Sequence, residues 1–106
     1  MRVDVLVFEG CPNGDASWEL VRRVAQEECP LAELRLVDVP DAESAERLRF
    51  LGSPSVQVDG EDIEASRLGD ESFSYSCRVY RTEEGTSGAV PESLVREALR
   101  RRVAQP

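Results

Sequence analysis

The N-terminal part of the chain alternates between strand-like and helix-like hydrophobic patterns, and this alternation limits the possible folds more than any other feature of the sequence. Residues 3–8 are apolar and rich in β-branched side chains apart from Asp4, which is typical of a strand buried on both faces. Residues 16–28 place apolar side chains at helical spacing, and residues 34–39 form a second strand-like run. A strand, a helix and a strand in this order predict two parallel strands joined by a right-handed crossover.

Turn and capping signals place four further elements in the rest of the chain. Asp41 is a favourable N-cap residue, and Gly52 ends the helix that begins there. Pro54 opens a short β-branched run, and Pro91 suits the first position of a last helix. We therefore expect a helix at residues 41–51, strands at Ser55–Val58 and residues 77–81, and a helix at residues 91–103.

The expected order of elements is β-α-β-α-β-β-α. This order predicts an α/β fold with a four-stranded mixed sheet, in which the last two strands form an antiparallel hairpin and helices flank both faces. A chain of 106 residues is long enough to bury one core, so we expect a single domain over residues 1–106. The polar stretch at residues 61–74 is the connection whose structure the pattern defines least.

The basic side chains restrict the possible chemistry. All 13 are arginine, because the sequence contains no lysine and no histidine. Without histidine there is no imidazole base, no Ser-His or Cys-His pair and no imidazole metal ligand. Without lysine there is no Schiff-base chemistry. Catalysis would have to use cysteine, carboxylates, hydroxyls, arginine or backbone dipoles, and we assign no cofactor and no metal-ligand set.

The charge balance and the cysteine count indicate the setting in which the chain works. A net charge of −8 disfavours nucleic acid and anionic membrane surfaces as partners. The apolar runs are strand-sized, so no membrane-spanning segment is expected, and the N-terminal residues lack a signal-peptide pattern. Three cysteines fit free thiols in a reducing compartment better than a disulfide scaffold, so we expect a cytoplasmic protein.

Cys11 occupies the turn between the first strand and the first helix. As an N-cap with Pro12 at the first helical position, its sulfur would face unpaired backbone N–H groups, which stabilise a thiolate. The carboxylates of Glu9, Asp15 and Glu19 act in the opposite direction. A single cysteine can also be a small buried hydrophobic residue, but its place in a Gly/Pro/Asn turn favours a reactive thiol.

Pro54 stands at the start of the third expected strand, in the segment Gly52-Ser53-Pro54-Ser55. A proline is tolerated at the first residue of a strand and not deeper within it. Taken alone, the Ser53-Pro54 bond is expected to be trans, as most bonds before proline are.

Together these two segments resemble the thioredoxin-like superfamily over nearly the whole chain. In that superfamily a cysteine at the N-terminus of the first helix faces a cis-proline that begins the third strand, and Cys11 and Pro54 match these positions. The resemblance implies that Cys11 is the catalytic nucleophile and that Pro12, Ser53 and Pro54 contact the substrate. Three segments are also similar to small bacterial thioredoxin-like proteins, some labelled alkylmercury-lyase-like: Gly-Cys-Pro-Asn, Arg-Phe-Leu-Gly-Ser-Pro and Ser-Cys-Arg-Val-Tyr.

The sequence departs from the dithiol members of that superfamily at Gly14. The motif reads Cys11-Pro12-Asn13-Gly14, so no second thiol lies where a Cys-x-x-Cys motif would place it. The segment with which glutaredoxins hold glutathione is also missing. Cys29 is expected about 27 Å from Cys11, at the opposite end of the same helix, and therefore cannot pair with it.

Cys77 is the remaining candidate for a resolving thiol. A simple hairpin between Ser55–Val58 and residues 77–81 would place Cys77 about 15 Å from Pro54. The long connection at residues 61–74 also permits another register or a fold-back, so Cys77 stays a candidate resolving or metal-binding thiol beside the alternative of an edge-strand core cysteine. Arg78 and Tyr80 share the opposite strand face and are interpreted as a surface pair.

Three functions fit these features. The leading hypothesis is thiol–disulfide exchange by Cys11 with a protein or small-molecule thiol or disulfide, resolved by Cys77, an external thiol or a second protomer. The alternatives are binding or handling of thiophilic metals such as mercury, and a non-catalytic interaction domain that kept the fold. The sequence does not indicate the oligomeric state.

Overall fold

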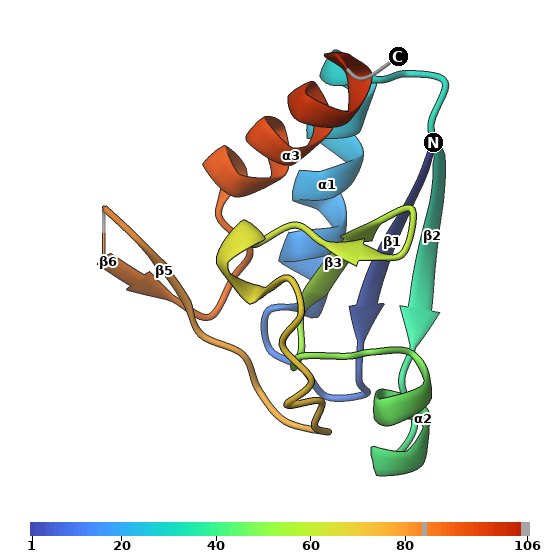
Figure 1. Ribbon diagram of the computed structural model, residues 1–106, viewed down its shortest axis with the longest axis vertical. Helices are drawn as coiled ribbons and strands as arrows, with labels where there is room; N and C mark the ends of the chain where they lie inside the picture. The colour runs from blue at the N-terminus through green and yellow to red at the C-terminus, as the bar shows by residue number, and fades with distance from the viewer. Residues whose placement is uncertain (84, 105–106) are drawn as a thin grey trace.

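The computed structural model describes residues 1–83 and 85–104. Its main sheet, visible in Figure 1, is mixed and has four strands by its backbone pairing. The strands lie in the order β2-β1-β3-β4. β1 and β2 are parallel, as the hydrophobic pattern predicts, whereas β3 pairs antiparallel with both β1 and β4. Their bounds are β1 at Arg2–Val7, β2 at Glu33–Asp38, β3 at Ser55–Val58 and β4 at Glu61–Asp62.

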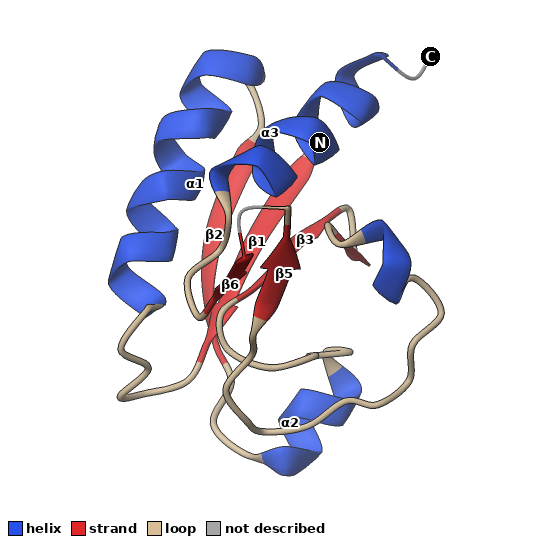
Figure 2. Cartoon of the chain, turned by 90° about the vertical axis from the view of Figure 1, so that its left-hand side faces the viewer, coloured by secondary structure: helices blue, strands red, loops and turns tan. Residues whose placement is uncertain are grey.

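Two helices pack side by side on one face of the sheet (Figures 1 and 2). They are α1 at Gly14–Glu28 and α3 at Glu92–Ala104. Alternate residues of the central strands point to this face, because successive side chains of a strand point to opposite sides of the sheet. The resulting core joins apolar side chains of both helices and both central strands: Val3, Val5, Val21, Val24, Val56, Val58, Val95 and Leu99.

A shorter helix packs on the opposite face. α2 spans Ala42–Arg47, and its side chains join a second core cluster with Leu6 and Phe50. The predicted cap is confirmed, because the Asp41 carboxylate accepts the Ser44 N–H at 2.7 Å. The helix ends four residues before the predicted boundary, and residues 48–49 form a turn after it. Helices therefore flank both faces, as the order of elements predicts.

The prediction of the fourth strand is wrong. It placed residues 77–81 beside β3, but β4 at Glu61–Asp62 takes that place. The reason is the Asp59-Gly60 turn, whose two residues both have positive φ (49° and 86°). A two-residue turn of this kind returns the chain at once, so the residues that follow it pair with β3.

The residues predicted for the fourth strand take part in two other pairings. β5 at Tyr80–Thr82 pairs with β6 at Gly85–Ser87 in a separate two-stranded sheet. Cys77 instead forms an isolated parallel bridge with Ser53, directly before β3. Of the helices that the structure describes, none is long and apolar enough to cross a bilayer.

The close approach of Gly52 to Arg78 yields a matched test of this arrangement. Gly52 has φ +112°, and an added Cβ would lie 3.0 Å from the Arg78 Cβ, whereas Gly60 has φ +86° and open space around it. Gly60→Ala is expected to cost about 1–2 kcal/mol of unfolding free energy through its backbone alone. Gly52→Ala is expected to cost about 1–3 kcal/mol more, because it also displaces residue 78. Urea unfolding of both variants measures the difference, and equal losses would contradict the packing.

Candidate functional site

The loop between β1 and α1, which we call the Cys11 loop (residues 8–13), meets the turn before β3 at one end of the sheet. The Phe8 N–H donates to the Ser53 hydroxyl at 3.3 Å, and the Cys11 N–H donates to the Phe8 carbonyl at 3.2 Å. The Ser53-Pro54 peptide bond is cis. The cis geometry differs from the trans bond expected for an isolated X-Pro pair and agrees with what the superfamily resemblance implies.

Cys11 is not the N-cap of α1, contrary to the prediction. The helix begins at Gly14 and its N-cap is Asn13, which leaves Pro12 outside the helix. Two successive turns separate strand from helix, because Cys11 donates its N–H to Phe8 and accepts the Gly14 N–H at 3.2 Å through its carbonyl. The thiol therefore lies one turn before the helix, and a capping role for it is excluded.

Cys11 lines an open hollow at the edge of the sheet. The hollow has a volume of about 590 Å³. Its apolar side chains include those of Val7 and Leu36, and the Leu36 residue is 50% exposed because β2 is an edge strand. Three exposed carboxylates also line it, those of Glu9, Asp15 and Asp38.

Cys77 lies at the same end of the sheet, in a segment that we call the strap (residues 74–78). The Ser53 N–H donates to the Ser76 carbonyl at 2.8 Å, and the Arg78 N–H donates to the Ser53 carbonyl at 3.0 Å. These two bonds flank Cys77 and hold it beside the cis peptide bond, with its side chain exposed. The simple hairpin, which placed Cys77 about 15 Å away, is therefore wrong. The isolated parallel bridge agrees instead with a fold-back of the long connection, the other arrangement that the connection permits.

A buried arginine anchors the strap. The Arg78 side chain is 1% exposed, and its two terminal nitrogens donate to the two Asp62 oxygens at 2.7 Å each. A further bond at 3.0 Å reaches Glu64. Burial acts to lower the pKa of the guanidinium, but the hydrogen bonds to Asp62 and Glu64 and the charge interactions with Tyr80 and Asp62 together outweigh it and raise that pKa, so Arg78 stays charged. The interpretation of Arg78 as a surface residue is wrong.

Tyr80 binds the backbone of the cis-proline, Pro54. Its ring lies under the guanidinium at 4.3 Å, and its hydroxyl donates to the Pro54 carbonyl at 2.6 Å. Burial raises the pKa of the Tyr80 phenol, which keeps the hydroxyl protonated as a donor. Tyr80 is therefore a core residue, fully buried, and not the surface partner that strand alternation predicts.

The residues expected to contact a substrate differ in accessibility. Pro12 is exposed, but Ser53 is 2% exposed and the Pro54 side chain is buried. Any partner of Ser53 would have to displace the strap, which occupies both of its backbone polar groups. Cys29 lies at the C-cap of α1, far from Cys11 along the helix as predicted, and burial raises the pKa of its thiol.

The sequence gives only weak signals for the ring contact between Phe8 and Tyr75 and for the two acidic partners of Arg78. The Phe8 and Tyr75 rings lie 5.1 Å apart and join the Cys11 loop to the strap. Asp62 and Glu64 belong to the polar stretch whose role the pattern leaves open. In the sequence, only the aromatic Tyr75 and the spacing of Asp62 and Glu64 on either side of Ile63 point to these positions.

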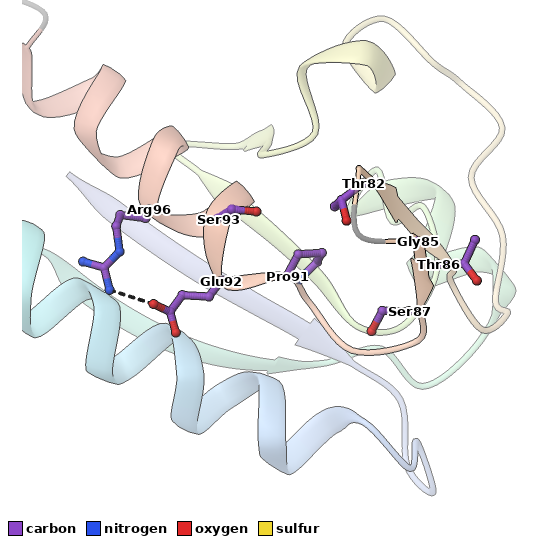
Figure 3. Close-up of a pocket in the computed structure, with 8 residues that line it drawn as sticks. All are labelled: Thr82, Gly85, Thr86, Ser87, Pro91, Glu92, Ser93 and Arg96. Carbon is purple, nitrogen blue, oxygen red and sulfur yellow. Dashed lines mark hydrogen bonds and ion pairs between the residues drawn. The ribbon is translucent and has the colours of Figure 1, made fainter.

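A second hollow lies away from the thiols, between the β5–β6 hairpin and the start of α3 (Figure 3). It measures about 580 Å³ and is lined by hydroxyl side chains together with Glu92 and Arg96, which form an ion pair at 3.0 Å. Among the described residues, no group of three or more histidine, cysteine or acidic side chains is arranged to hold a metal ion.

In comparisons with known proteins, no family model, curated protein or solved structure matches this chain.

The position of Gly14 makes a dithiol variant testable. An ideal Cβ on Gly14 would lie 3.7 Å from the Cys11 Cβ, within the range of about 3.5–4.5 Å found in disulfides. Gly14→Cys is therefore expected to form a disulfide between Cys11 and the introduced thiol under mild oxidation, detected by peptide mass mapping. Gly14→Ser is the control of similar size. Failure of the cysteine variant to cross-link would show that the loop does not hold Cys11 against the helix start.

Proposed function

We propose that this chain is a thiol redox protein of thioredoxin-like fold, in which Cys11 attacks a disulfide and Cys77 resolves the intermediate. The order of elements supports this fold, as does a cis-proline directly before β3. A cysteine in the turn between β1 and the first helix supports the role of Cys11. Each of these features matches what the superfamily resemblance implies.

The observation that carries the proposal is the pairing of Cys77 with Ser53. Ser53 also bonds to Phe8, whose carbonyl holds the Cys11 loop. Two thiols that are 66 positions apart in the sequence thus flank the same pair of residues. Cys77 is exposed and Cys11 is half-buried at an open hollow, so both sulfurs have access to reagents. Access and a thiolate are the requirements of thiol–disulfide exchange.

The proposed reaction has two steps. In the first, the Cys11 thiolate attacks one sulfur of a disulfide R–S–S–R, forms a mixed disulfide and releases RS⁻, which takes up a proton. In the second, the Cys77 thiolate attacks the Cys11 sulfur and releases the second RS⁻. The protein gains an intramolecular disulfide, and two thiols leave as the reduced product.

The position of the second thiol differs from that of a Cys-x-x-Cys motif. Gly14 is buried against Val7 and Cys11 and offers no side chain. In this proposal Cys77, which belongs to a distant segment of the chain, takes the role that the second cysteine has in a Cys-x-x-Cys motif. The terminal nitrogens of Arg78 donate to Asp62, Glu64 and Ser55 and are therefore not available as hydrogen-bond donors to either sulfur.

Mapping the products of mild oxidation tests this proposal. With a small disulfide as oxidant, the expected product is an intramolecular Cys11–Cys77 disulfide, and Cys29 remains a free thiol. Cys77→Ser is expected to accumulate the mixed disulfide on Cys11, while Cys11→Ser gives no intramolecular disulfide. Cys29→Ser is the matched control and should behave as the unmodified chain does.

Two outcomes would overturn the proposal. One is a Cys11 that does not react with any disulfide, which would favour a non-catalytic domain. The other is stoichiometric capture of a mercuric ion by Cys11 and Cys77 without disulfide exchange, which would favour metal handling.

A further inference from the structure

The strap occupies the place where an extended polypeptide would bind beside the cis-proline. A peptide that adds to a sheet does so through the free N–H and C=O groups of an edge. Both backbone groups of Ser53 are already bonded to the strap, at 2.8 and 3.0 Å. The strap in turn is held by the buried Arg78 ion pairs. A polypeptide therefore finds no free backbone partner at this position.

The open route to Cys11 is the hollow beside the edge strand. Its volume of about 590 Å³ lies within the range of about 300–1,000 Å³ for small-molecule sites. Val7 and the half-exposed Leu36 give it apolar surface against which a short carbon chain can pack. The geometry therefore admits a low-mass disulfide more readily than a strand of another protein.

The charge of the hollow selects among low-mass disulfides. The carboxylates of Glu9, Asp15 and Asp38 all line it. Within the described part of the chain, none of the ion pairs involves these three groups. Uncompensated carboxylates around a concave site concentrate cations and repel anions. A positively charged reagent also offsets the repulsion between these carboxylates and the Cys11 thiolate.

We propose that the substrate of Cys11 is a small, positively charged disulfide, bearing ammonium or guanidinium groups, and not a polypeptide or an anionic disulfide. This inference rests on the proposed exchange chemistry and adds the substrate class. In its first step the Cys11 thiolate forms a mixed disulfide with one half of the substrate and displaces the other half as an ammonium- or guanidinium-bearing thiolate, whose sulfur takes up a proton. The ammonium groups of the bound half lie among the carboxylates of the hollow.

Three disulfides of similar length and different charge test the proposal. They are cystamine, which is cationic, hydroxyethyl disulfide, which is neutral, and dithiodipropionate, which is anionic. The measurement is the rate at which each disulfide forms a mixed disulfide on Cys11 in a Cys29→Ser, Cys77→Ser chain. This rate is divided by the rate at which the same disulfide reacts with a neutral reference thiol. Normalised in this way, cystamine is expected to react about tenfold or more faster than dithiodipropionate at low ionic strength. In about 1 M salt, where the Debye length is about 3 Å, the ratio should approach one.

Single-charge variants locate the effect. Glu9→Gln and Asp38→Asn are each expected to lower the ratio several-fold, whereas Glu97→Gln on α3, which removes an exposed charge outside the hollow, should leave it unchanged. A neutral peptide disulfide should react no faster than hydroxyethyl disulfide after the same normalisation. A ratio near one at low salt, or a faster reaction with the peptide disulfide, would overturn the substrate class. A Cys11 unreactive toward all four reagents would instead overturn the exchange chemistry itself.

Discussion

The end of the fold that carries Cys11 and Cys77 depends on one buried ion-pair cluster, formed by the Arg78 guanidinium with the carboxylates of Asp62 and Glu64. A charge this deeply buried is stable only when partners satisfy it, and removing one partner from such a pair typically costs about 3–5 kcal/mol. Here two carboxylates, the Ser55 hydroxyl and the Tyr80 ring surround the guanidinium. Only its Nε, among the side-chain atoms that the structure describes, is buried without a hydrogen-bond partner.

From this ion-pair cluster a continuous set of contacts leads to the thiols. Arg78 fixes the strap, the strap pairs with Ser53 on both sides of Cys77, and the Ser53 hydroxyl accepts the Phe8 N–H at the base of the Cys11 loop. The same pairing that brings Cys77 to this end of the sheet also closes the backbone edge beside the cis-proline. One structural element therefore accounts for both proposals, a resolving thiol from a distant segment and a preference for small substrates that enter through the open hollow.

Local sequence patterns predict the elements that form through near neighbours in the chain, and they do not predict the contacts between distant segments. The parallel β1–β2 pair and the Asp41 cap follow from periodicity and a single side chain, and both are confirmed. The prediction of the fourth strand is wrong because the two-residue Asp59-Gly60 turn returns the chain directly, so that Glu61–Asp62 pair with β3. Arg78 reads as an exposed strand residue, since its acidic partners lie 14 and 16 positions earlier in an irregular stretch. Cys11 lies two residues before the N-cap of α1, because two successive turns that have no clear sequence pattern separate β1 from the helix.

Amide hydrogen exchange of Ser53 and Arg78 tests most directly the claim that the strap is a fixed part of the sheet. Both N–H groups take part in the strap pairing, and both residues are nearly fully buried. Their exchange is expected to require an opening free energy close to that of global unfolding, like that of the β1 and β3 core amides. Exchange of these two amides at the rate of the exposed loops, with the core amides still protected, would show that the strap opens freely and would contradict the account.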